Sequence, residues 1–98
     1  MRLDAEEQQA IEAALEGVRA DAVYLFGSRA NDRAKGGDID ILVLSSEDSF
    51  ELSRKIATRF FEHCEEKIDV VVMNPTEITP EQQAFLNVLR RGNMERLK

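Results

Sequence analysis

Apolar and polar positions follow two different periods along the first third of the chain. In residues 4–16, apolar residues recur every three or four positions, which is typical of one face of a helix, and Gly17 is placed to end it. Residues 22–26 form a run of strand-forming residues that is too short for a helix, and Gly27 and Ser28 stop it. The pattern predicts a helix followed by a strand.

Two further strands enclose a second helix. Residues 38–44 begin polar and become wholly apolar, as in a buried strand whose first end reaches the surface, and residues 67–73 form a similar run. The helix between them is expected to begin at Asp48, with Glu51 three residues later as a capping partner. Its buried face is predicted to carry Leu52, Ile56, Ala57, Phe60, Phe61 and Cys64.

A last helix has the clearest start signal. Thr79 is its predicted N-cap, Pro80 takes the first helical position, and Gln82 completes the capping pattern. Its apolar residues are Ala84, Phe85, Val88 and Leu89. The pattern does not decide whether this helix continues past Gly92.

This order of elements predicts an α/β (α+β) fold, with a small mixed β-sheet packed with helices in two or three layers. The segment between residues 26 and 38 is too short for a crossover helix between parallel strands, so the first pair of strands is expected to be antiparallel or mixed. A chain of 98 residues fits one domain, spanning residues 1–98.

Composition excludes several classes of protein. A formal net charge of −6 argues against general binding of nucleic acid, although a compact anion could still bind a local basic pocket. Cys64 is the single cysteine, so neither a disulfide framework nor a Cys-rich zinc site is expected. With no secretory signal and no apolar run of about 20 residues, we expect a cytoplasmic protein that does not span a membrane.

Aspartates carry the first candidate chemistry. Asp38 and Asp40 are two apart in a predicted strand, so both side chains point to one face with Cα atoms roughly 6.6 Å apart. Asp69 lies inside the third predicted strand, where a carboxylate is costly unless it is paired or binds a metal. Together they would suit Mg²⁺ or Mn²⁺. Taken singly, each is a common turn or strand residue.

The segment before these aspartates could bind phosphate. Gly27 permits close approach of the backbone, and the Ser28 hydroxyl and nearby N–H groups could donate to phosphate oxygens. Arg29, Arg33 and Lys35 give the segment a local positive charge in an acidic chain, although the last two could equally belong to a solvated loop.

The stretch GSRANDRAKGGDIDILV, together with the later KIDVVVM, resembles the minimal nucleotidyltransferases of the DNA polymerase beta superfamily. The signature of that family is Gly-Ser, about ten residues, Asp-x-Asp and a third acidic residue on a later strand; here nine residues separate Ser28 from Asp38. The resemblance implies a polymerase-beta-like fold, with Asp38, Asp40 and Asp69 as catalytic ligands of two Mg²⁺ ions. It also implies that Gly27, Ser28 and Arg29 bind the nucleotide, ATP.

Proteins that this sequence resembles often act as antitoxins of HEPN-domain ribonucleases, and some transfer AMP to a tyrosine of the toxin. The resemblance therefore implies transfer of a nucleoside monophosphate from ATP to a hydroxyl on a HEPN-type partner. The alternative is a binding module that neutralises the partner by occlusion and whose nucleotide site is idle. Self-association, the base preference and the identity of the acceptor stay open.

Overall fold

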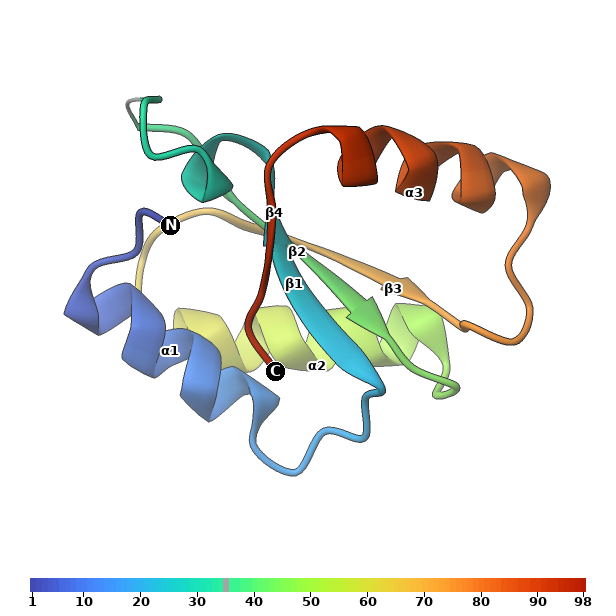
Figure 1. Ribbon diagram of the computed structural model, residues 1–98. Coiled ribbons are helices and arrows are strands. Elements are labelled where there is room, and N and C mark those ends of the chain that lie inside the picture. Colours follow the sequence, from blue (N-terminus) through green and yellow to red (C-terminus); the bar gives the residue numbers. More distant parts are fainter. Residues whose placement is uncertain (35) are drawn as a thin grey trace.

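The computed structural model describes residues 1–34 and 36–98. Three helices, four strands and one 3₁₀ turn alternate along the chain (Figure 1). In chain order these are α1 (Ala5–Leu15), β1 (Ala22–Phe26), η1 (Gly27–Ala30), β2 (Ile39–Leu44), α2 (Ser49–Phe61), β3 (Ile68–Met73), α3 (Pro80–Arg91) and β4 (Met94–Arg96).

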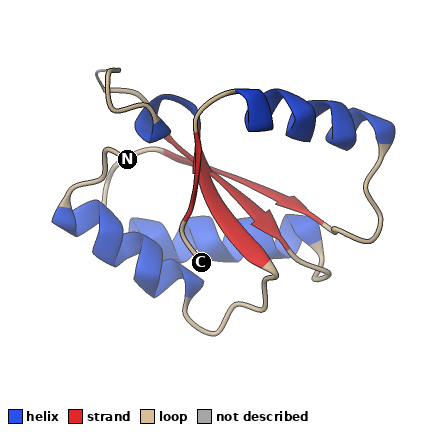
Figure 2. Cartoon of the chain, in the orientation of Figure 1, coloured by secondary structure: helices blue, strands red, loops and turns tan. Residues whose placement is uncertain are grey.

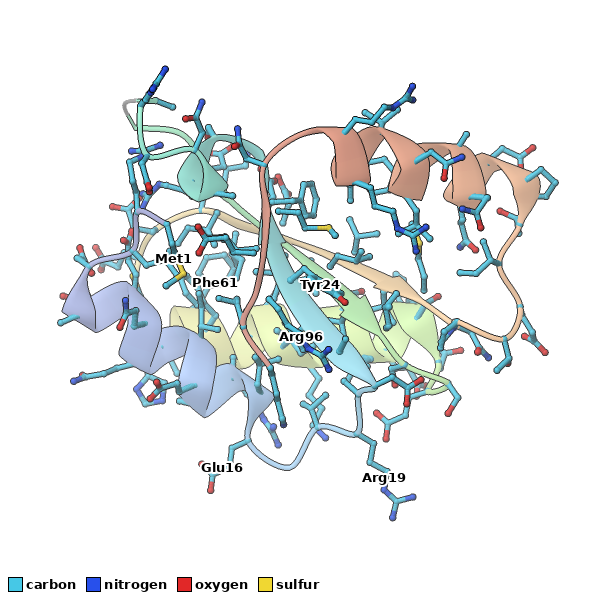
Figure 3. The ribbon with its side chains drawn as sticks, in the orientation of Figure 1. Met1, Glu16, Arg19, Tyr24, Phe61 and Arg96 are labelled. Carbon is cyan, nitrogen blue, oxygen red and sulfur yellow. The ribbon has the colours of Figure 1, made fainter. Side chains whose placement is uncertain are left out.

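The four strands form one mixed sheet in the order β3-β2-β1-β4. β1 is antiparallel to both β2 and β4, whereas β2 and β3 run parallel. The antiparallel first pair confirms the prediction from the short connection between β1 and β2. Across the β1–β4 pair, Tyr24 lies opposite Arg96 (Figure 3).

Helices cover both faces of the sheet, so the domain has three layers (Figures 1 and 2). Because side chains alternate along a strand, Val23, Leu25 and Ile41 face α1 and α2, and Phe26 and Leu42 face α3. The larger core cluster lies on the side of α1 and α2, and a smaller one lies under α3. The predicted α+β class with a small mixed sheet is confirmed.

The predicted helix starts are confirmed because capping is a local interaction. At α3, the Thr79 side chain accepts from the N–H of Gln82, whose side chain accepts in turn from the Thr79 N–H. At α2, Asp48 accepts from the Glu51 N–H at 2.9 Å. None of the helices in the described ranges is long and apolar enough to cross a membrane.

One predicted core position is wrong, because Phe61 is 51% exposed. In α3, the apolar residues Ala84 and Val88 are also exposed, Val88 at 59%. α3 packs on the sheet through a narrower face that uses Leu86 and Leu89, so Val88 lies outside it. α2 ends at Phe61, and Cys64 is buried just beyond its end.

The observed strands differ from the predicted ones at three places. β2 and β3 begin one residue later than predicted, so Asp38 and Lys67 lie just before the strands. β4 was not predicted at all, because a three-residue strand that contains Glu95 and Arg96 has no apolar alternation to reveal it.

Candidate active site

The parallel pairing of β2 and β3 brings two of the predicted aspartates together. Asp40 and Asp69 are direct neighbours in the register, on strands that lie about 4.8 Å apart. Their positions alternate with the residues that face α1 and α2, so both carboxylates project on the α3 side of the sheet. Asp38 lies one residue before β2 and is half exposed.

Negative charge is concentrated at Asp40. Partial burial raises the pKa of the Asp40 carboxyl, and the neighbouring charges of Asp69 and Asp38, with a hydrogen bond to Asp69, raise it further. One cation is close by, since Lys67 Nζ lies 3.5 Å from Asp38 Oδ2. Both side chains of that pair are largely solvated, so it offsets little of the repulsion.

The Gly-Ser turn lies directly against this carboxylate. Gly27 has φ +74°, and a Cβ atom added to it would lie 2.7 Å from Asp40 Oδ2. Gly37 has φ +94°, and its Cβ would lie 2.0 Å from Ser28 Oγ. Both positions therefore require glycine, for the left-handed backbone and for the close approach. The fold thus brings Gly27 to Asp40, and Ser28 to Gly37, the residue before Asp38.

Arg29 lies in a different environment from the one predicted. Its Nη1 donates to Glu7 Oε1 at 2.9 Å and to the Arg2 carbonyl at 3.0 Å, and its Nε donates to the Gly37 carbonyl at 2.9 Å. The hydrogen bond to Glu7 raises the pKa of the guanidinium. Arg29 therefore joins α1 to the segment before β2, and its role toward nucleotide stays a prediction.

Two residues of this network were missed by sequence reasoning. Glu7 is 3% exposed and completes a capping box with Asp4, a pattern that the sequence DAEE does contain. Arg2 donates to three backbone carbonyls of the site segment, and no sequence signal marks it; they belong to Ser28, Asn31 and Gly36.

The two remaining basic residues add little to this geometry. Arg33 is exposed, and its backbone N–H donates to Asn31 Oδ1 at 3.0 Å. Lys35 lies outside the described residues. Their predicted role as a basic rim is therefore not tested.

Carboxylate chemistry at the site fits a divalent ion. Asp38, Asp40 and Asp69 offer oxygen ligands, which Mg²⁺ and Mn²⁺ prefer. The pKa of Asp40 is raised first by partial burial and then by the charges of Asp69 and Asp38, and a bound cation would offset that repulsion. Within the described ranges, no group of three His, Cys, Asp or Glu side chains is already arranged to hold a metal ion. The metal role of the three aspartates stays a prediction.

The family model described as Polymerase beta, Nucleotidyltransferase matches residues 8–89, a span that includes the Gly-Ser turn and all three aspartates. The chain belongs to this family. As a polymerase beta nucleotidyltransferase domain, it has the fold that the mixed sheet and its helices indicated, and its general chemistry is nucleotidyl transfer. No curated protein sequence matches the chain.

Proposed function

We propose that this domain transfers a nucleoside monophosphate, AMP from ATP, to a hydroxyl on a partner protein, and that the transfer depends on a divalent metal. The observation that carries the proposal is the position of the Asp40 carboxylate, beside Asp69 and directly against the Cα of Gly27. A turn whose first residue, Gly27, has no side chain lies next to a carboxylate of the cluster. That combination suits a triphosphate whose charge is balanced by metal ions.

The carboxylates of the cluster have different roles in this proposal. Asp38 and Asp40 would hold two Mg²⁺ ions, or Mn²⁺, and Asp69 would complete one ligand shell. When bound, such ions stabilise the incoming and the leaving oxygens of an in-line displacement that releases pyrophosphate. Asp69 is exposed, so its free carboxylate oxygen can accept a hydrogen bond from the attacking hydroxyl and orient it.

The turn supplies the contacts for phosphate. Because Gly27 has no side chain, the triphosphate can approach its backbone beside Asp40. The Ser28 hydroxyl is held above Gly37 and offers one donor at this edge. Positioning and charge balance carry most of the catalysis in phosphoryl chemistry, so few side chains are needed.

A protein acceptor is favoured by charge. The net charge of −6 suits a basic partner. We therefore propose a HEPN-domain protein as the acceptor, with an antitoxin role for this domain.

Transfer of the label from ATP tests the proposal. The domain is incubated with α-labelled ATP, Mg²⁺ and the product of an adjacent HEPN-type gene, in wild type and in Asp38→Asn and Asp40→Asn. The wild type and the control Asp21→Asn, whose side chain lies in the loop before β1, should label the partner, and the two site variants should not. Label transfer that survives both substitutions would sink the mechanism, and a tight complex without any transfer would favour the occluding module.

A further inference from the structure

β3 is an edge strand with an open side. It pairs with β2 alone among the strands of residues 1–34 and 36–98. The Ile39 N–H donates to the Lys67 carbonyl at 3.1 Å, and the Ser45 N–H donates to the Met73 carbonyl at 2.9 Å. Because hydrogen-bonding direction alternates along a strand, the odd positions of β3 bond to β2. The N–H and C=O groups of Ile68, Val70 and Val72 therefore point outward.

The other edge of the sheet is protected, but this one is not. β4 has three residues, of which Glu95 and Arg96 are charged, and short charged strands rarely pair with another chain. β3 has six residues with the sequence IDVVVM, and Asp69 is its one charged residue. An apolar edge of this length is a site for strand pairing.

An exposed aromatic flank of α2 borders the same edge. Phe50 is 67% exposed and Phe61 is 51% exposed. At about 100° per residue, the two lie within about 20° of each other around the helix, and half-buried Ala57 lies between them. Arg59 points to the opposite side, where its Nη1 donates to the Glu16 carbonyl of the α1 C-cap at 2.7 Å. Since α2 packs beneath β3, its aromatic flank faces away from α1, toward the open edge.

We propose that a second copy of this chain pairs with β3, antiparallel, about a two-fold axis at Val70. This axis sets Val70 against its own copy and Ile68 against Val72 of the second copy. These are the residues whose backbone groups point outward, so each N–H meets a C=O across the interface. Asp69 then lies opposite Val71 of the second copy, and the two Asp69 carboxylates do not face each other.

The same two-fold axis also brings the aromatic flanks of the two α2 helices together. α2 connects two parallel strands, so it runs antiparallel to β3, and the axis sets the two α2 helices side by side in opposite directions. Phe50 of one copy then lies beside Phe61 of the other, at both ends of the helix pair. Both rings lose their exposure to water together, which favours association.

The charge of the exposed α2 flank favours a second copy of the chain over a basic partner. The chain carries a net charge of −6, yet the α2 flank has no carboxylate. It consists of Phe50, Ser53, Arg54, Ala57, Thr58 and Phe61. Its one cation, Arg54, lies over the chain's own Phe50 ring at 5.6 Å. The carboxylates that border the flank at its Phe61 end, Glu62, Glu65 and Glu66, lie beyond it. Along the flank itself a basic partner finds no counter-charge, whereas two copies can meet there through uncharged side chains. The inference does not depend on the proposed enzymatic activity.

Light scattering on a gel-filtration column across a concentration series tests the interface. The wild type should approach twice the chain mass of 11.1 kDa as its concentration rises. The double variant Phe50→Glu/Phe61→Glu should stay at 11.1 kDa with an unchanged circular dichroism spectrum, because both positions are exposed. The control Val88→Glu changes an equally exposed apolar residue on α3 and should still dimerise. A wild type that is monomeric at every concentration, or a double variant that still dimerises, would overturn the proposal.

Cross-linking tests the pairing itself, independently of the aromatic residues. In a Cys64→Ala background, Val70→Cys should oxidise to a reducible dimer, because directly opposed residues have Cα atoms about 5.5 Å apart, within disulfide range. Val71→Cys should remain a monomer, because on this axis its own copy is not directly opposite. Cross-linking of Val71→Cys but not of Val70→Cys would exclude this register and overturn the two-fold axis at Val70.

Discussion

Asp40 is the residue where burial, charge and close packing meet. Its carboxylate is partly buried, lies beside two other carboxylates and contacts the one backbone position, Gly27, that leaves room for it. A fold gains nothing from such an arrangement by itself, since each of these features disfavours the ionised form or restricts the chain. The same features give a metal ion and a triphosphate a defined place, which is why we assign the site to catalysis.

Asp40→Asn should therefore stabilise the metal-free protein and abolish nucleotidyl transfer. The pKa of Asp40 is raised, so its protonated form favours folding at acid pH, and that contribution is lost as the pH rises through the raised pKa. At neutral pH the ionised carboxylate opposes folding, and the amide removes this cost. We expect a gain of up to about 1 kcal/mol at pH 7, since the group is partly solvated.

Urea unfolding at two pH values measures this effect. The gain should vanish below the ordinary aspartate pKa of about 3.9, where Asp40 is protonated in both states. The control Asp21→Asn should change stability by less than about 0.5 kcal/mol at either pH. A variant less stable than wild type at pH 7 would show that Asp40 is a structural residue.

The aspartates of the site could be predicted from the sequence, but the ion pair that positions the neighbouring turn could not. Strand alternation in the sequence predicts Asp38 and Asp40 on one face, although Asp38 lies one residue before β2 in the structure. The third carboxylate, Asp69, is visible as a charged residue in an otherwise apolar run. The pair of Glu7 and Arg29 joins positions twenty-two residues apart, and no local pattern encodes that contact.

At the scale of elements, the η1 turn determines whether Asp40 has room. Gly27 and Gly17 have the same φ of +74°, but a Cβ at Gly17 would have nothing within 4 Å, whereas one at Gly27 would meet Asp40 Oδ2. Substituting alanine at Gly17 therefore tests the left-handed backbone alone, whereas substituting alanine at Gly27 tests the backbone and the contact with Asp40 together.

Gly27→Ala and Gly17→Ala should have similar stabilities and different activities. Each should lose about 1–2 kcal/mol of unfolding free energy, because alanine is strained in the left-handed region. Gly27→Ala should also displace the Asp40 carboxylate and lower nucleotidyl transfer at least about tenfold, the equivalent of roughly 1.4 kcal/mol in the barrier. Denaturant unfolding and initial rates check both. Equal activity in the two variants would mean that the turn does not constrain Asp40.

The contact between α1 and η1 is a buried ion pair. Glu7 is 4% exposed and Arg29 is 12% exposed at the side chain, and Glu7 Oε1 accepts from both Arg29 and the Asp4 N–H. Glutamine can replace the helix cap but not the charge.

Glu7→Gln should thus destabilise the fold by about 3 kcal/mol, the lower end for a broken buried ion pair. It removes the closest counter-ion of the buried guanidinium and leaves Glu66 Oε2, at 3.9 Å from Arg29 Nη2. Glu51→Gln is the matched control: Glu51 lies at the same helical position in α2, is exposed, and should cost less than about 0.5 kcal/mol. Chemical denaturation measures both. If the two losses are equal, the ion pair does not hold α1 to the turn.

Elements were predictable where their signals are local. Thr79 and Gln82 encode the start of α3 within four residues, whereas β4 forms only because β1 offers it a free edge. Phe61 and Val88 occur at the helical spacing of core residues, yet both are exposed. The apolar face of each helix is wider than the part that packs on the sheet. Their exposure depends on tertiary packing, which one sequence does not show.

At the scale of the whole molecule, ligand binding should appear as stability. Mg²⁺ or Mn²⁺ with ATP should raise the thermal midpoint, because ligands that bind only the folded state stabilise it, by about 2.7 kcal/mol at one hundred times the dissociation constant. Differential scanning fluorimetry with metal, ATP and both together measures the shift. Asp40→Asn serves as the control and should respond much less than wild type. No shift in wild type at millimolar concentrations would count against a working site.

The most direct measurement follows the two ends of ATP separately. The domain, Mg²⁺ and the partner protein are incubated with ATP labelled at either the α- or the γ-phosphate, in wild type and Asp40→Asn. We predict that the acceptor gains the α-label alone, that the γ-label leaves as pyrophosphate, and that Asp40→Asn transfers neither. Transfer of the γ-label to the acceptor, or α-label transfer that Asp40→Asn leaves unchanged, would contradict the account.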